Sequence, residues 1–152
     1  MPKDNRNITG KLLPDEGGAY FLVIRLTKPR TITVGKLGRF SFAHGYYLYC
    51  GSAKKGIRAR VVRHLRQKNK RLHWHIDYLL ADPAAEVITT HAFVNREECE
   101  LVKVLITCGG KPHPLGFGAS DCRAGCRSHL VFFNSIGKVN MAISQLADCS
   151  EA

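Results

Sequence analysis

Residues 46–53, which read Tyr46-Tyr47-Leu48-Tyr49-Cys50-Gly51-Ser52-Ala53, predict an aromatic strand that ends in a glycine turn. A basic helix is expected directly after this strand, from Gly56 to Gln67. Upstream, the motif Gly17-Gly18-Ala19-Tyr20 starts an apolar strand that runs to Leu26 and is typical of a central strand covered on both faces. We expect these segments to bring two phenols, an arginine and a histidine to one positively charged, concave surface.

The 152-residue chain is strongly basic, with 23 Lys and Arg against 12 Asp and Glu and a formal net charge of +11. Its densest basic block, residues 54–71, contains no acidic residue. A clustered positive field attracts polyanions, so the sequence predicts contact with nucleic acid. The residues expected to make this contact are Lys54, Lys55, Arg58, Arg63, Arg66, Lys68, Lys70 and Arg71.

The chain is long enough for one domain with a real core, and no apolar run approaches the length of a membrane span. Its N-terminus lacks the apolar segment of a secretory signal, which predicts a cytoplasmic protein. In that compartment the six cysteines are expected as free thiols or metal ligands rather than as disulfides. Three segments are predicted: a flexible lead-in over residues 1–16, one domain over 17–133 and a C-terminal helical extension over 134–152.

Hydrophobic periodicity predicts an α+β fold, with one small, mostly antiparallel sheet and helices packed on it. The first strands are expected to form an antiparallel meander over residues 21–26, 31–34, 39–42 and 45–50. Later strands are expected over 86–93 and 130–133. Helices are expected over 57–67, 73–80, 96–107 and 139–146, with Asn95 as the cap of the third. Residues 111–127 are predicted to form a long loop rich in Gly, Pro, Cys and His.

Three short motifs occur in a fixed order: Gly18-Ala19-Tyr20, Tyr49-Cys50-Gly51 and Arg60-x-x-x-His64. A glutamate, Glu98, follows on a later predicted helix. In this order the motifs resemble the GIY-YIG nuclease superfamily, with residues 17–133 most similar to a little-characterised branch sometimes fused to endonuclease III-type DNA glycosylases. Each motif alone is weak, and their order is the specific signal.

The resemblance implies a metal-dependent endonuclease that hydrolyses phosphodiester bonds in DNA, with DNA repair as one setting. By position, Tyr20 and Tyr49 line the site, Arg60 steadies the charge on the phosphate, His64 sits beside it, and Glu98 holds Mg²⁺ or Mn²⁺. The alternative is a binding module that keeps the fold and has lost turnover. A third reading is an RNA-directed protein.

The chain departs from the superfamily in two places. Its two tyrosine motifs are unusually far apart, so we expect an inserted hairpin at about Thr27–Gly45. The later Asn of the superfamily has no obvious match, and Ser120 or Asp121 is the candidate for its place.

Structural explanations compete with these roles. The tyrosines could serve sheet packing, Arg60 could be a solvated helix charge, and Glu98 could balance a helix dipole, with Glu97 and Glu100 as rival metal ligands. A joint metal site at His73 and His75 is disfavoured, because the two side chains point to different sides of a helix start. We expect Trp74 and Tyr78 to pack in the core.

The predicted loop contains three soft metal ligands in eight residues, Cys122, Cys126 and His129. They could bind zinc with Cys108 or His113 as the fourth ligand. The spacing is not that of a common zinc module, so reduced thiols are favoured over zinc. A redox-active disulfide between Cys122 and Cys126 is a further alternative.

Overall fold

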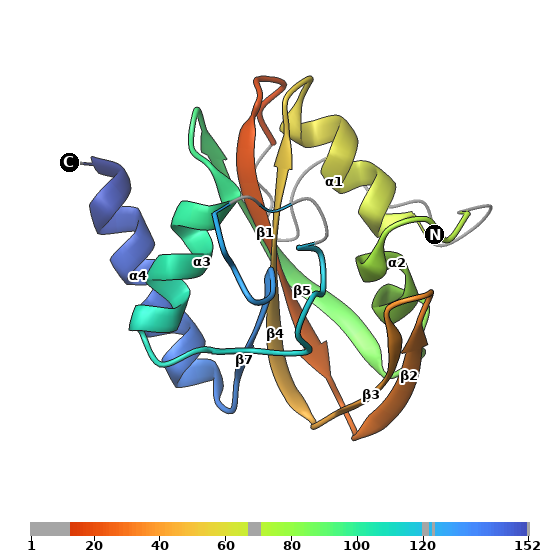
Figure 1. Ribbon diagram of the computed structural model, residues 1–152. Helices are drawn as coiled ribbons and strands as arrows, with labels where there is room; N and C mark the ends of the chain where they lie inside the picture. The colour runs from red at the N-terminus through yellow and green to blue at the C-terminus, as the bar shows by residue number, and fades with distance from the viewer. Residues whose placement is uncertain (1–12, 67–70, 120–121, 123, 152) are drawn as a thin grey trace.

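A five-stranded antiparallel sheet forms the middle layer of the computed structural model, which describes residues 13–66, 71–119, 122 and 124–151 (Figure 1). The strand order is β5-β1-β4-β7-β6, and every neighbouring pair is antiparallel. The strands are β1 (Gly18–Leu26), β4 (Gly45–Ala53), β5 (Ala85–Val94), β6 (Lys111–Pro112) and β7 (Leu130–Phe133). The predicted α+β class is confirmed. Most of the predicted lead-in lies outside the described residues.

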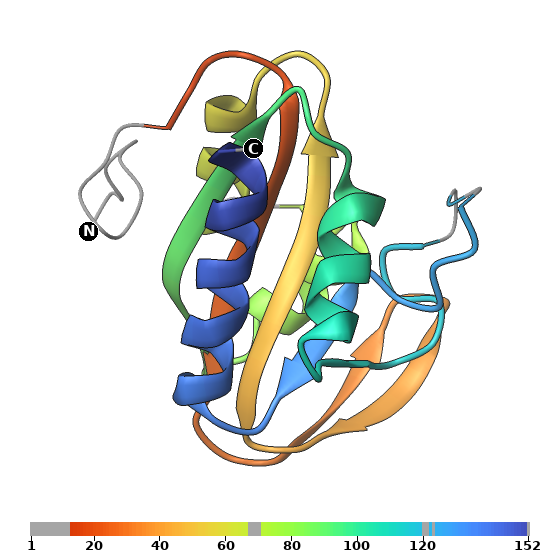
Figure 2. The ribbon, with the colours of Figure 1, turned by 90° about the vertical axis from the view of Figure 1, so that its left-hand side faces the viewer.

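Both faces of the sheet are covered by helices. Alternate residues of β1 point to opposite faces and therefore belong to two different buried clusters. Tyr20, Leu22 and Ile24 join one buried cluster, together with residues of α1 (Ile57–Leu65) and α2 (His75–Leu80). Ala19, Phe21 and Val23 join a second cluster, together with residues of α3 (Glu98–Thr107) and α4 (Ile136–Glu151). Figures 1 and 2 show the resulting three layers, with α3 and α4 on one side of the sheet and α1 and α2 on the other.

The predicted meander is wrong, because β1 pairs directly with β4. The two strands between them, β2 (Arg30–Val34) and β3 (Gly38–Phe42), pair with each other in a separate two-stranded sheet. The alternating pattern identified these segments as strands, but it holds no information about which strand each one pairs with. The expected hairpin within residues 27–45 is therefore confirmed, and it packs Val34 and Phe42 against the core beside α2.

All four helices differ from prediction at their ends: α1 ends at Leu65, two residues early, and α2 begins at His75, two residues late. The N-cap of α3 is Glu97, not Asn95; Asn95 instead adopts a left-handed conformation (φ 62°) in the turn that leaves β5. Helix α4 begins earlier and ends later than predicted, and its Val139, Ala142 and Leu146 are buried in the same cluster as α3. The C-terminal helix is thus part of the core layer.

A buried carboxylate fixes the start of α2. Asp77 is fully buried and accepts two hydrogen bonds from the Arg63 guanidinium, at 2.9 and 3.1 Å. It also accepts hydrogen bonds from the backbone amides of His73 (2.8 Å) and Trp74 (2.9 Å). Burial by itself raises the pKa of Asp77, but these hydrogen bonds and the charge of Arg63 outweigh it and hold the pKa below 3.8. The pair therefore joins α1 to α2.

Replacing Asp77 by alanine should lower the free energy of unfolding by about 3–5 kcal/mol, because the Arg63 charge and two amides lose their acceptor. Urea unfolding measures this loss. Asp15→Ala is the matched control, since Asp15 pairs with Arg58 while its own side chain is 75% exposed; its effect should be much smaller.

The Asp77–Arg63 pair should also make the stability of the fold depend on pH in the acidic range. Because the folded pKa of Asp77 is depressed, its contribution is complete above the ordinary value near 3.8 and is lost as the pH falls through the folded pKa. The Asp77→Ala protein should lack this part of the acid destabilisation. Equal stability of wild type and Asp77→Ala at neutral pH would contradict this account.

Candidate active site

A polar pocket of about 330 Å³ brings together all five residues predicted to be catalytic. Its lining comes from β1, β4, α1, α2, α3 and the loop that precedes β7. The lining residues are Tyr20, Tyr49, Ser52, Arg60, His64, His73, Trp74, His75, Glu98, Gly118, Cys122 and His129. A larger, mainly apolar cavity of about 600 Å³ lies between the β2–β3 hairpin and β6–β7, and none of the five residues lines it. The smaller pocket is the candidate site because ionisable groups converge in it.

The register of β1 and β4 places the two tyrosine motifs side by side. Tyr20 is opposite Gly51, and Leu22 is opposite Tyr49. The Tyr20 ring lies against the Gly51 backbone, so a Cβ atom at position 51 would collide with the phenol end of that ring. The glycine of the second motif is therefore the residue that leaves space for the tyrosine of the first.

Tyr20 is hydrogen-bonded to His64 of α1, with 2.7 Å between the phenol oxygen and Nε2. Burial raises the pKa of Tyr20 well above 10, and the neighbouring Tyr49 raises it further, whereas Arg60 opposes this shift. Burial and the nearby Glu98 likewise raise the pKa of Tyr49. Both phenols are therefore protonated at neutral pH.

Arg60 is held at the mouth of the pocket by its backbone and aromatic neighbours. Its guanidinium donates a hydrogen bond to the Ser52 carbonyl oxygen (3.2 Å) and lies 4.6 Å from the centre of the Trp74 ring. Arg63 lies over the same ring, at 4.2 Å. Trp74 was expected in the core; it packs against the core and also lines the pocket, where it supports Arg60.

Glu98 reaches this pocket although α3 covers the opposite face of the sheet. Strand β7 pairs with β4 only over Tyr46–Tyr49, so the last residues of β4 extend beyond it. Figure 1 shows that α1 and α3 both begin at this end of the sheet. Burial raises the pKa of the Glu98 carboxyl, and the Arg60 charge and a hydrogen bond from Ser52 act against this rise.

The two rival carboxylates serve the helix start. Glu97 is the N-cap residue, and its amide donates a hydrogen bond to Glu100 (3.3 Å). Glu100 also forms an ion pair with Arg96, at 2.9 Å. Neither residue lines the pocket, which leaves Glu98 as its carboxylate.

The predicted nucleic-acid contacts divide into two groups. Lys54, Lys55, Arg66 and Arg71 are exposed. Arg63 is engaged with Asp77, and Arg58 is bonded to the Leu13 carbonyl and paired with Asp15. Lys68 and Lys70 lie outside the described residues, as do Ser120 and Asp121, the candidates for the superfamily Asn.

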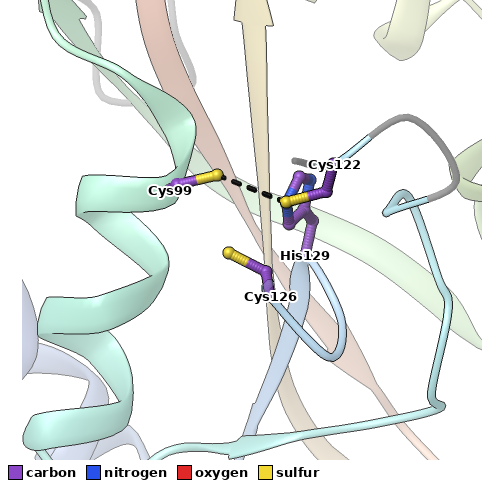
Figure 3. Close-up of side chains that lie close together, drawn as sticks. All are labelled: Cys99, Cys122, Cys126 and His129. Carbon is purple, nitrogen blue, oxygen red and sulfur yellow. Dashed lines mark hydrogen bonds between the residues drawn. The ribbon is translucent and has the colours of Figure 1, made fainter. Parts of the chain in front are cut away.

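Three cysteines and one histidine, two of which line the pocket, form a cluster that could hold a metal (Figure 3). Its members are Cys99, Cys122, Cys126 and His129, whose ligand atoms all lie within 4.8 Å of one another. The fourth member is thus Cys99, and not Cys108 or His113; the His113 ring is hydrogen-bonded to the Ser41 carbonyl (2.8 Å). Cys122 and Cys126 are free thiols, not a disulfide. The sequence does not reveal Cys99 as a ligand, because it lies 23 residues before Cys122.

The chain belongs to a family described as a domain of unknown function, DUF123, whose profile matches residues 19–151. A search of curated proteins found no match, and neither did a search of solved structures. Within the described ranges, the helices lack the combination of length and apolar content that a membrane crossing needs.

Replacing Gly51 by alanine should displace the Tyr20 ring and separate its hydroxyl from His64. Such overpacking costs about 1–3 kcal/mol in the free energy of unfolding, which urea titration measures. Gly137→Ala is the matched control, because a Cβ at position 137 in α4 would meet nothing within 4 Å apart from its chain neighbours and the backbone of its own helix. If both variants were as stable as wild type, the close packing of Tyr20 on Gly51 would be refuted.

Proposed function

We propose that this protein is a metal-dependent endonuclease of the GIY-YIG type that hydrolyses phosphodiester bonds in DNA. One observation carries the proposal: residues of β1, β4, α1 and α3, far apart in sequence, line one pocket. The types that converge are those that phosphodiester hydrolysis requires, namely a cation for the phosphate charge, proton-transfer groups and a hard oxygen ligand.

Arg60 is the residue suited to the phosphate. Its guanidinium is fixed by the Ser52 carbonyl and by the Trp74 ring, so little side-chain freedom is lost when it binds an anion. An arginine held in this way stabilises the charge that develops on the phosphate oxygens during attack.

Tyr20 and His64 are suited to proton transfer as a pair. Because burial raises the Tyr20 pKa, a free phenolate is not the base at neutral pH. A neutral His64 with an unprotonated Nε2 accepts the Tyr20 proton across their 2.7 Å hydrogen bond, while the phenol oxygen accepts a proton from the attacking water. The two transfers together leave hydroxide at the phosphorus and an imidazolium at His64.

The pocket offers a divalent metal one suitable ligand. Glu98 contributes a carboxylate, the ligand that Mg²⁺ and Mn²⁺ prefer, and its side chain remains 29% exposed toward the pocket. One carboxylate is enough for Mg²⁺ that also binds water and substrate phosphate. When bound, the metal would supply charge neutralisation at the scissile phosphate.

Replacing Glu98 by glutamine should lower the cutting rate at least about 100-fold and leave DNA binding largely unchanged, because it removes the only carboxylate of the pocket in the described chain. Nicking of plasmid and branched DNA with Mg²⁺ or Mn²⁺ measures the rate. Glu86→Gln is the matched control, since Glu86 pairs with Arg25 on the surface outside the pocket.

Equal cutting by wild type and Glu98→Gln would remove Glu98 from the mechanism. If wild type binds DNA but cuts no substrate with either metal, the protein is a binding module and the proposal is wrong. Preferential binding of RNA at matched salt would redirect the proposal from DNA to RNA.

The basic turn between β4 and α1 should supply affinity rather than chemistry. Replacing exposed Lys54 and Lys55 together by alanine should weaken DNA binding and reduce the slope of log affinity against log salt by up to about 2, roughly 0.9 per lost phosphate contact. Lys138→Ala is the control, because exposed Lys138 lies on α4, on the other side of the sheet. An unchanged salt slope in the double variant would exclude this turn from the DNA interface.

A further inference from the structure

We propose that Cys99, Cys122, Cys126 and His129 bind one structural Zn²⁺ that fixes the wall of the pocket from which Glu98 projects. Zinc is the metal that such a soft, four-ligand set favours. The ligands come from three separate places in the chain: the first turn of α3, the loop after Gly118, and the residue that precedes β7 (Figure 3).

Two distances within the cluster match those of a tetrahedral site. Zn–S bonds of about 2.3 Å and Zn–N bonds of about 2.0–2.1 Å place two sulfurs about 3.8 Å apart, and a sulfur and a nitrogen about 3.6 Å apart. The Cys99 and Cys122 sulfurs are 3.6 Å apart, and the Cys99 sulfur is 3.8 Å from His129 Nε2. No ligand atom is farther than 4.8 Å from another, so small rotations of the side chains complete the site.

Four protein ligands leave no open position, which is the arrangement of a structural rather than a catalytic zinc. A structural metal would also stabilise the segment that carries Cys122 and Cys126. Ala124 and Gly125, which lie between Cys122 and Cys126 in the chain, are exposed. Between Gly118 and His129 the sequence has no apolar residue larger than alanine other than its cysteines, so a metal would supply the contact that holds this stretch against α3.

The other nitrogen of His129 connects the cluster to the proposed catalytic carboxylate. His129 is buried, and its Nδ1 lies 3.6 Å from the Glu98 Oε2 atom. A histidine that binds zinc through Nε2 carries its proton on Nδ1 and presents it to a neighbouring carboxylate. Glu98 also directly precedes Cys99 in the chain. The zinc would therefore position Glu98 both through the backbone and through His129.

Zinc binding itself does not depend on the proposed nuclease function; only its effect on Glu98 does.

The alternative explanation for the closeness of the Cys99 and Cys122 sulfurs is a disulfide. Bonded sulfurs are about 2.05 Å apart, so Cys99 and Cys122 would have to move closer by more than 1 Å. The experiment below separates the two explanations.

The test is elemental analysis of the full chain purified under reducing conditions, followed by zinc release to a chelator. We expect one zinc per chain in wild type and in Cys108→Ser, whose thiol lies on the C-cap of α3 outside the cluster. Cys126→Ser should lose zinc to the chelator at least about 10-fold more readily. When Co²⁺ replaces Zn²⁺ in the wild-type protein, we expect the intense visible absorption of a tetrahedral cobalt–thiolate site. This measurement tests ligation without any variant, so it remains valid if Cys126→Ser fails to fold.

A wild-type protein that contains no zinc, binds neither Zn²⁺ nor Co²⁺ stoichiometrically, or carries a Cys99–Cys122 disulfide in peptide mapping would overturn the proposal. Failure of the nuclease assay with zinc present would overturn the proposed function and leave the zinc site standing. Cutting at the wild-type rate after complete removal of zinc would overturn the positioning of Glu98.

Discussion

The antiparallel pairing of β1 with β4 is the constraint on which the rest of the site depends. It places Tyr20 across from Gly51, and only a residue without a side chain leaves room for the phenol there. Because Tyr20 is thereby held flat against β4, its hydroxyl is directed to His64 on α1. The pairing also leaves β2 and β3 as a separate hairpin, which explains how two motifs so distant in sequence are adjacent in space.

The positive side of the pocket depends on a buried ion pair outside it. Asp77 binds Arg63 and the amides that begin α2, and this fixes the place of Trp74. Trp74 in turn lies beneath both Arg60 and Arg63. One arginine is thus used to build the fold, while its neighbour one turn earlier remains directed to the pocket. Within the basic block of residues 54–71, Arg63 therefore has a structural role, whereas Arg60 lines the pocket.

The negative side depends on how α3 begins. Glu97 and Glu100 complete the helix start, so that Glu98 is the carboxylate left to face Arg60. The next residue, Cys99, turns toward the loop that carries Cys122. One candidate zinc ligand, Cys99, and the candidate magnesium ligand, Glu98, are therefore consecutive residues of one helical turn. The candidate Mg²⁺ site and the candidate Zn²⁺ site are therefore adjacent, but they have no ligand in common.

The sequence by itself predicted most of the secondary structure: the apolar run of β1, the aromatic strand β4 and the last strand β7 could each be recognised locally, although β6 was expected to be loop. The order of the motifs also predicted the five site residues that the pocket brings together. Only the tertiary structure decided the pairing partners, since period-two alternation is the same whichever strand lies alongside. It also decided that Arg63 is committed to Asp77 and that Cys99 completes the cluster. These are contacts across long sequence separations, where chain entropy and packing, rather than local pattern, select the partner.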